Sequence, residues 1–128
     1  MVKQIKDYDG IVRIHAHGRV KNVLDYIVGM VADATDPIEP PPHGDTELKY
    51  LRKKYGKQLV LFGNIEIADI ENMPSDMFRK AVRQSIADGT SGEGRGFVLM
   101  PTSAPYGRTI SEITLRNYQI MVEEVENI

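Results

Sequence analysis

The strongest constraint on the fold is a fourfold alternation between short apolar, strand-like runs and longer segments of helical periodicity within 128 residues. The strand-like runs cover residues 11–17, 36–39, 58–63 and 96–101. They recur about every 30 residues, which is the size of a βαβ unit, and such units contain parallel strands and right-handed crossovers. The sequence therefore predicts an α/β fold made of four βα units around one parallel sheet.

Apolar residues at intervals of three and four mark the helices between these runs. The predicted helices cover residues 20–34, 45–56, 75–89 and 109–128, and residues 1–10 look like the end of a preceding helix. Gly44 and Asp45 are expected to cap the second helix at its start and Gly56 at its end. Ser75 is expected to cap the third, and Thr109 with Glu112 forms a candidate capping box for the last. The run at 58–63 is continuously apolar, which predicts a strand buried on both faces.

Four βα units are half of a (βα)8 barrel, which typically needs about 250 residues. An open four-stranded parallel sheet exposes two strand edges and one face. We therefore expect residues 1–128 to form one half-barrel domain that is covered by another chain. This partner is either a second copy, giving a dimer, or a separate half-barrel.

The composition limits the classes of binding partner and the cellular location that we expect for this chain. The chain has 16 basic and 18 acidic residues, so no excess of charge points to nucleic acid or an anionic membrane. The absence of cysteine excludes disulfides, thiolate metal ligands and a cysteine nucleophile within these residues. No apolar run approaches the ~18 residues needed to span a bilayer, and the first ten residues do not resemble a signal peptide. A cytoplasmic protein acting on a small molecule is expected, without a membrane or nucleic-acid partner.

Polar side chains follow all four predicted strands, where parallel α/β folds place their chemistry. They are His15, His17 and Arg19 after the first strand, Glu39 after the second, Asn64 and Glu66 after the third, and Thr102, Ser103 and Tyr106 after the fourth. The alternation of a strand places His15 and His17 on one face together with Arg13. Neutral imidazole and carboxylate are suitable ligands for zinc or another divalent metal.

The residues by themselves leave several alternatives open. The histidines fit metal coordination and a metal-free polar substrate site equally well, and a structural role remains a third possibility. Glu39 is as compatible with capping, or with an ion pair to Arg13 or Arg19, as with metal ligation. Asn64 is as compatible with hydrogen bonding to loop backbone, and Tyr106 with packing as a lid. His43, in a proline-rich loop, is expected to be solvated.

Taken together, these motifs resemble the C-terminal half of the uroporphyrinogen decarboxylase superfamily, which also contains the corrinoid-dependent, zinc-binding methyltransferases. The resemblance extends over almost the whole chain, through RIHAHGRV, TDPIEPPPHGD, LVLFGNIEI, GFVLMPTSAPYG and SEITLRNY. The family fold is a (βα)8 barrel, so the resemblance implies that this chain corresponds to its last four units.

The resemblance also implies roles for individual residues. The methyltransferase branch has a His-x-Cys pair and a later cysteine that bind zinc and activate a thiol. Here the pair is His15-Ala16-His17, and Ser103 stands near the late position. The expected metal ligands are therefore His15, His17 and Glu39, the expected catalytic residues are Tyr106 and Glu66, and the expected substrate-binding residues are Arg13, Arg19, Asn64 and Ser103.

The expected cofactor is a divalent metal, zinc in the first place, with a corrinoid or tetrapyrrole as substrate. One alternative is a tetrapyrrole carboxy-lyase of porphyrin biosynthesis, in which Arg13, Arg19 and Arg108 would pair with substrate carboxylates. Against it, the loop after the last strand lacks the histidine that contacts the tetrapyrrole in the decarboxylases. The other alternative is a non-catalytic half-barrel subunit that needs a partner chain.

Overall fold

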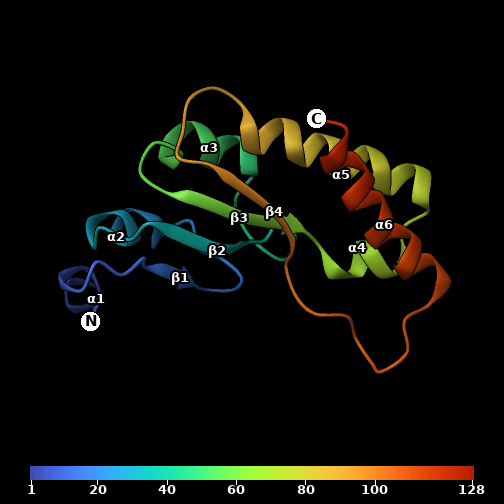
Figure 1. Ribbon diagram of the computed structural model, residues 1–128, viewed down its shortest axis with the longest axis horizontal. Coiled ribbons are helices and arrows are strands. Elements are labelled where there is room, and N and C mark those ends of the chain that lie inside the picture. The colour runs from blue at the N-terminus through green and yellow to red at the C-terminus, as the bar shows by residue number, and fades with distance from the viewer.

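The computed structural model describes all residues, 1–128, and is built around one four-stranded sheet (Figure 1). The strands are β1 (Arg13–His15), β2 (Ala34–Ile38), β3 (Val60–Ile65) and β4 (Phe97–Pro101). They lie side by side in the order β1-β2-β3-β4, and every pair is parallel. This confirms the predicted α/β class and is consistent with half of a (βα)8 barrel.

Six helices accompany the sheet: α1 (Val2–Asp7), α2 (Leu24–Gly29), α3 (Leu48–Tyr55), α4 (Ile67–Asn72), α5 (Ser75–Thr90) and α6 (Glu112–Glu126). In Figure 1, α3, α5 and α6 lie along one side of the sheet, and the loop between β4 and α6 extends away from them. No helix combines the length and the apolar character that crossing a membrane requires.

Two apolar clusters fill the space between the sheet and its helices. The first joins α2 and α3 to β2 and β3 through Leu24, Ile27, Leu51, Ile38 and Leu61, all nearly inaccessible to solvent, and the partly buried Ile14 of β1 packs against it. The second joins α4, α5 and α6 to the end of β3, and its members include Ile65, Ile70, Phe78, Val82 and Ile120. Burial of these side chains is the main contribution to stability, about 1.5–3 kcal/mol for each large aliphatic or aromatic residue.

The opposite face of the sheet is only partly covered. Buried and half-buried residues alternate along β3, so the prediction of a strand buried on both faces is wrong. On this open face the Arg13 guanidinium lies 5.2 Å from the centre of the Phe62 ring. Helices on one face, together with unpaired edges at β1 and β4, are the geometry expected of half a barrel.

The region after β1 differs most from the sequence prediction. A helix was expected over 20–34, but α2 covers only Leu24–Gly29, and Ala34 already belongs to β2. Val31 stands between them with φ of 61°. Its left-handed backbone ends the helical path and turns the chain into β2, although the apolar spacing continues through it.

Smaller differences affect the ends of other elements. Ser111, not Thr109, caps α6, because its side chain accepts a hydrogen bond from the Thr114 amide. The N-cap residue of α5 is Pro74 and not Ser75, and the N-cap residue of α3 is Glu47 and not Gly44 or Asp45. The C-cap at Gly56 is confirmed. β1 is shorter than the predicted run 11–17, and β3 is displaced towards its carboxyl end, so that Asn64 lies inside it.

Candidate functional site

A polar pocket of about 250 Å³ lies at the carboxyl ends of the strands, and we call it the strand-end pocket. The segment after each strand contributes to it, because parallel strands bring their carboxyl ends to the same edge of the sheet. The lining residues are His17 after β1, Glu39 and His43 after β2, Glu66, Ile67 and Ala68 after β3, and Thr102, Ser103 and Tyr106 after β4.

His17 and Glu39 form the first imidazole–carboxylate pair of this pocket. His17 Nδ1 lies 2.8 Å from Glu39 Oε1, and the Gly18 amide donates to the other oxygen, Oε2. Burial alone would raise the pKa of Glu39, but the hydrogen bonds from His17 and Gly18 outweigh it and hold the pKa below its usual range. Glu39 is therefore a carboxylate at neutral pH that fixes the imidazole by Nδ1 and leaves Nε2 free.

His43 and Glu66 form a second pair, which the sequence analysis missed. His43 Nδ1 lies 3.1 Å from Glu66 Oε2, and Thr102 Oγ1 donates to the same oxygen at 3.1 Å. The hydrogen bond and the negative charge of Glu66 raise the pKa of His43. Although the His43 side chain is 57% exposed, it is not simply solvated, because one nitrogen is bound. The one feature of the sequence that points to a site role for His43 is its position, shortly after a predicted strand and directly after three prolines.

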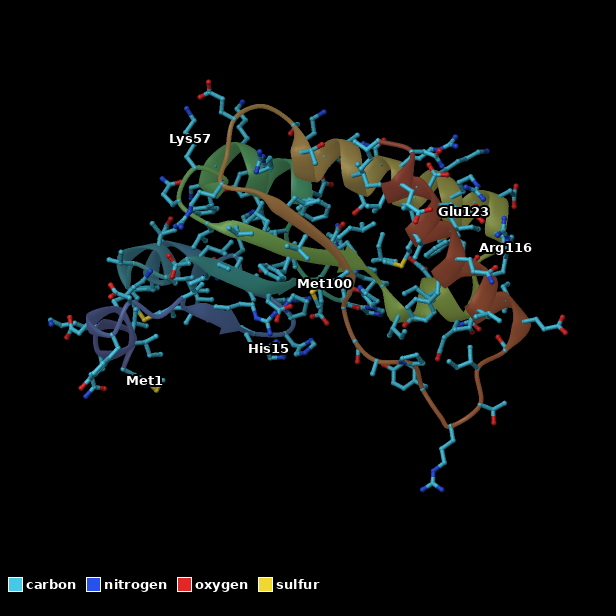
Figure 2. All side chains as sticks on the ribbon, in the orientation of Figure 1. Met1, His15, Lys57, Met100, Arg116 and Glu123 are labelled. Atoms are coloured by element: carbon cyan, nitrogen blue, oxygen red, sulfur yellow. The ribbon has the colours of Figure 1, made fainter.

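His15 belongs to a different group at the end of β1, where Figure 2 labels it. Its Nδ1 lies 3.0 Å from Asp36 Oδ2, and Arg13 Nε lies 3.4 Å from the same oxygen. Asp36 is 2% exposed, and its second oxygen has no hydrogen-bond partner. The His15 and His17 rings meet edge to face with centroids 4.8 Å apart. The structure thus brings the two histidines together but attaches each to its own carboxylate.

These contacts bear directly on the expected metal site of His15, His17 and Glu39. Each histidine has Nδ1 committed to a carboxylate, and both Glu39 oxygens are engaged, by His17 and by Gly18. Two free Nε2 atoms remain, whereas a tetrahedral zinc site takes three or four protein ligands. No group of three or more His, Asp or Glu side chains in the molecule is arranged to hold a metal ion. The residue set in this arrangement does not fit zinc.

Asn64 does not reach the strand-end pocket. Its Oδ1 accepts a hydrogen bond from Ser85 of α5, so the amide points towards the helices. There it lines a neighbouring pocket of about 220 Å³ with Asp69, whose pKa is raised by burial, and with Glu66, which lies between the two pockets. Asn64 therefore lies in the neighbouring pocket and not among the predicted residues that line the strand-end pocket.

The remaining predicted residues divide into two groups. Ser103 and Tyr106 line the strand-end pocket, and the Tyr106 amide donates to Glu71 at 2.7 Å, which ties the β4–α6 loop to α4. The arginines do not converge on the pocket: Arg13 is bound to Asp36, whereas Arg19 and Arg108 are exposed and form no ion pair. Glu39 pairs with His17 and not with Arg13 or Arg19.

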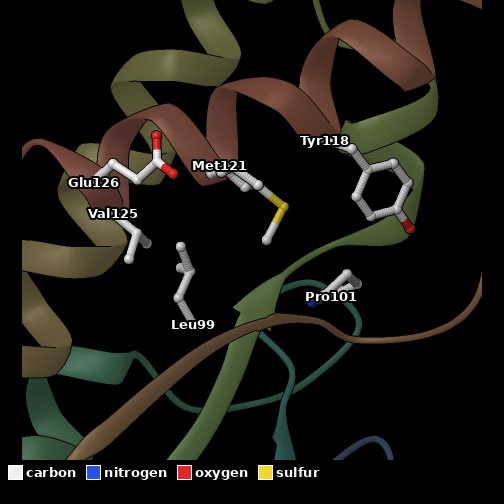
Figure 3. A pocket seen from close by; sticks show the side chains of 7 residues that line it. Leu99, Pro101, Tyr118, Met121, Val125 and Glu126 are labelled. Carbon is white, nitrogen blue, oxygen red and sulfur yellow. The ribbon is translucent and has the colours of Figure 1, made fainter.

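A second, apolar hollow of about 430 Å³ lies between β4 and α6 (Figure 3). Leu99, Pro101, Tyr118, Met121, Val122, Val125 and Glu126 line it. It adjoins the unpaired edge of the sheet, and Val122 and Val125 remain about half exposed there, at 57% and 48%. The hollow is therefore an exposed apolar surface beside a free strand edge.

Comparison with known proteins adds no assignment, because neither the protein-family models nor the curated proteins contain a match to this chain.

Proposed function

We propose that this chain is the C-terminal half of a (βα)8-barrel enzyme resembling the corrinoid-dependent methyltransferases of the uroporphyrinogen decarboxylase superfamily, and that its substrate binds in the strand-end pocket. The observation that carries the proposal is the convergence of polar side chains from all four strand ends on one cavity. This is where barrel enzymes of any chemistry hold their reacting groups. The resemblance in sequence motifs supplies the reaction class.

The chemistry proposed for the pocket is proton transfer by the His17–Glu39 pair. When a thiol attacks a methyl carbon, the S–C bond forms, the bond from carbon to the leaving group breaks with its electron pair, and the thiol proton must go to a base. A neutral imidazole held through Nδ1 by a carboxylate offers Nε2 as that base. Because the residues do not fit zinc, this step uses the protein's own base to activate the thiol.

A binding experiment tests the substrate class. The ¹⁵N-labelled chain is titrated with methylcobalamin, with 2-mercaptoethanol and with uroporphyrin, each followed by amide chemical shifts. We expect saturable shifts at Gly18, Ala68 and Ser103 for methylcobalamin or the thiol, and at least fivefold weaker binding in His17→Gln. Asn72→Ala, an exposed change outside the pocket, is the matched control. Saturation by uroporphyrin alone would favour the carboxy-lyase instead, and no saturable shift with any probe would refute the proposal.

We also propose that another chain covers the open edges, as either a second copy or a partner half-barrel. The apolar hollow beside β4 and the free edge of β1 support this, since unpaired parallel edges and exposed valines are costly to leave in water. Size-exclusion chromatography with light scattering distinguishes the cases. A dimer supports self-association, and a poorly soluble or weakly folded monomer supports a missing partner. A soluble monomer with a cooperative melt contradicts both.

A further inference from the structure

We propose that His43 is a second acid–base residue of the strand-end pocket and that Glu66 is the residue that positions it. The inference goes beyond the proposed methyl transfer and rests on it only in placing a substrate in this pocket. It also changes the role of Glu66, which is expected from the sequence to be catalytic itself, because Oε2 of Glu66 is bound by His43 and Thr102, while its buried Oε1 has no hydrogen-bond partner.

The loop that carries His43 is built to hold this side chain in one place. Pro40, Pro41 and Pro42 have fixed φ angles, so little backbone freedom remains to be lost when the loop is ordered. The Gly44 amide donates to the Pro40 carbonyl at 3.0 Å, which closes the turn. A Cβ at Gly44 would lie 1.8 Å from the Glu39 carbonyl oxygen, so the turn is too tight for any other residue.

Glu66 is itself fixed from the opposite side. It is 8% exposed, and Thr102 Oγ1 donates to its Oε2 while accepting from the Ile67 amide at 3.4 Å. Thr102 is 3% exposed and follows β4, so the carboxylate is anchored to the sheet. His43, Glu66 and Thr102 therefore form a chain in which each member orients the next, the arrangement by which carboxylates set the tautomer of catalytic histidines.

The charged groups that face His43 are few and all acidic. They are Glu66 at the start of α4, Glu39 at the end of β2 and Asp69 within α4, and each raises the pKa of His43. His17 and Tyr106 complete the titratable lining of the pocket. With Nδ1–H donated to Glu66, the protonated imidazole has Nε2–H left to give to a ligand. The fitting ligand is a small polar molecule with a basic oxygen or nitrogen that takes up a proton during reaction.

The two pairs can divide the work of acid and base between them. His17 Nε2 would accept a proton from an attacking group, and His43 Nε2–H would donate one to an oxygen or nitrogen that leaves with the electron pair of its bond to carbon. A proton then enters and a proton departs in each cycle, so no net charge builds up in the pocket. Enzymes that need both functions at one pH commonly use two titratable groups held in different environments.

Histidine NMR tests the inference without any substrate. Three histidines give a simple ¹⁵N imidazole spectrum, assigned with His15→Gln, His17→Gln and His43→Gln and followed from pH 5 to 9. We expect the titration midpoint of His43 to lie above the ordinary histidine pKa of about 6.5. We expect this midpoint to fall by about one unit in Glu66→Gln. Glu66→Asp, which keeps the charge, should fall between the two. Glu93→Gln, an exposed change on the loop before β4, is the control and should have no effect.

Carbethoxylation by diethyl pyrocarbonate provides a second readout, because the reagent attacks unprotonated imidazole nitrogen. At pH 6 we expect His43 to react at its free Nε2, and Glu66→Gln to react up to about tenfold faster because one unit of pKa changes the neutral fraction by that factor. An unmodified His43, or a midpoint that Glu66→Gln leaves unchanged, would overturn the proposal. Neither readout uses methylcobalamin or a thiol, so failure of the proposed function and failure of this inference are separate results.

Discussion

Asn117 is the residue whose replacement we expect to reveal most about how the pocket is supported. It lies on α6, is fully buried, and uses all of its hydrogen-bonding groups across three helices. Its Nδ2 donates to the carbonyls of Ile70 at 3.0 Å and Met73 at 2.9 Å, at the end of α4, and its Oδ1 accepts from Ser75 Oγ at 2.9 Å. Since α4 begins beside Glu66, this one amide holds the helix that forms one wall of the strand-end pocket.

The magnitude follows from what Asn117→Ala leaves behind. The Ile70 carbonyl is buried and would lose its side-chain donor, and an unsatisfied buried group costs about 1–3 kcal/mol. The Met73 carbonyl and the Ser75 hydroxyl are partly buried, so each costs about 1 kcal/mol. The free energy of unfolding should therefore fall by about 3–5 kcal/mol. Asn117→Asp should be at least as harmful, because it sets a carboxylate oxygen against two carbonyl oxygens.

Urea denaturation followed by far-ultraviolet circular dichroism measures this loss, since the chain has no tryptophan. Asn72→Ala is the matched control: its amide also donates to a helix carbonyl, that of Ala68 at 2.8 Å, but the bond is exposed. We expect a change within about 0.5 kcal/mol for that variant. An Asn117→Ala protein that unfolds within 1 kcal/mol of the wild type would refute the reasoning, because it would mean that the amide bonds contribute little beyond what water supplies.

Three further changes test other parts of the structure. Arg52→Met should cost about 2–3 kcal/mol by urea denaturation, because the guanidinium, on a residue 6% exposed, donates to three carbonyls of the loop before β4; an unchanged stability would show that the loop does not depend on it. Val31→Gly should raise stability by about 1 kcal/mol, because φ of 61° is costly for a β-branched residue and the side chain is 69% exposed; a loss in thermal melting would contradict this. The hydrogen bond from Lys6, followed by that from the Val12 amide, lowers the pKa of Asp33 to about 2, so its stabilising contribution is complete above about pH 4 and is lost as pH falls through about 2. Urea midpoints measured from pH 2 to 6 should therefore depend less on pH in Asp33→Asn, and equal slopes would exclude this linkage.

The architecture could be predicted because its signals are local. Apolar runs separated by helical periods at the length of βαβ units leave few topologies once crossovers are right-handed, and the four parallel strands appear in that order. Boundaries were less predictable. The helical spacing after β1 continues through Val31, and nothing in the local pattern indicates that its backbone turns left-handed there.

The site was only half predictable for a related reason. That polar residues follow each strand is visible in the sequence, and Glu39, Glu66, Ser103 and Tyr106 do meet in one pocket. Which partner each residue takes is not visible. His15 and His17 share one face of the predicted strand and are candidates for one metal or substrate site, but they hold different carboxylates. One of these carboxylates, Asp36, lies within a strand and is not among the predicted site residues.

The sequence by itself determined the class of fold and the edge of the sheet where chemistry gathers, because periodicity and strand order act over a few residues at a time. Only the tertiary structure decided that His43 turns back onto Glu66, that Asn64 points to α5, and that Asp36 holds His15 at the end of β1. These pairings depend on distances between segments more than 20 residues apart, and such distances are set by how the strands and helices pack together.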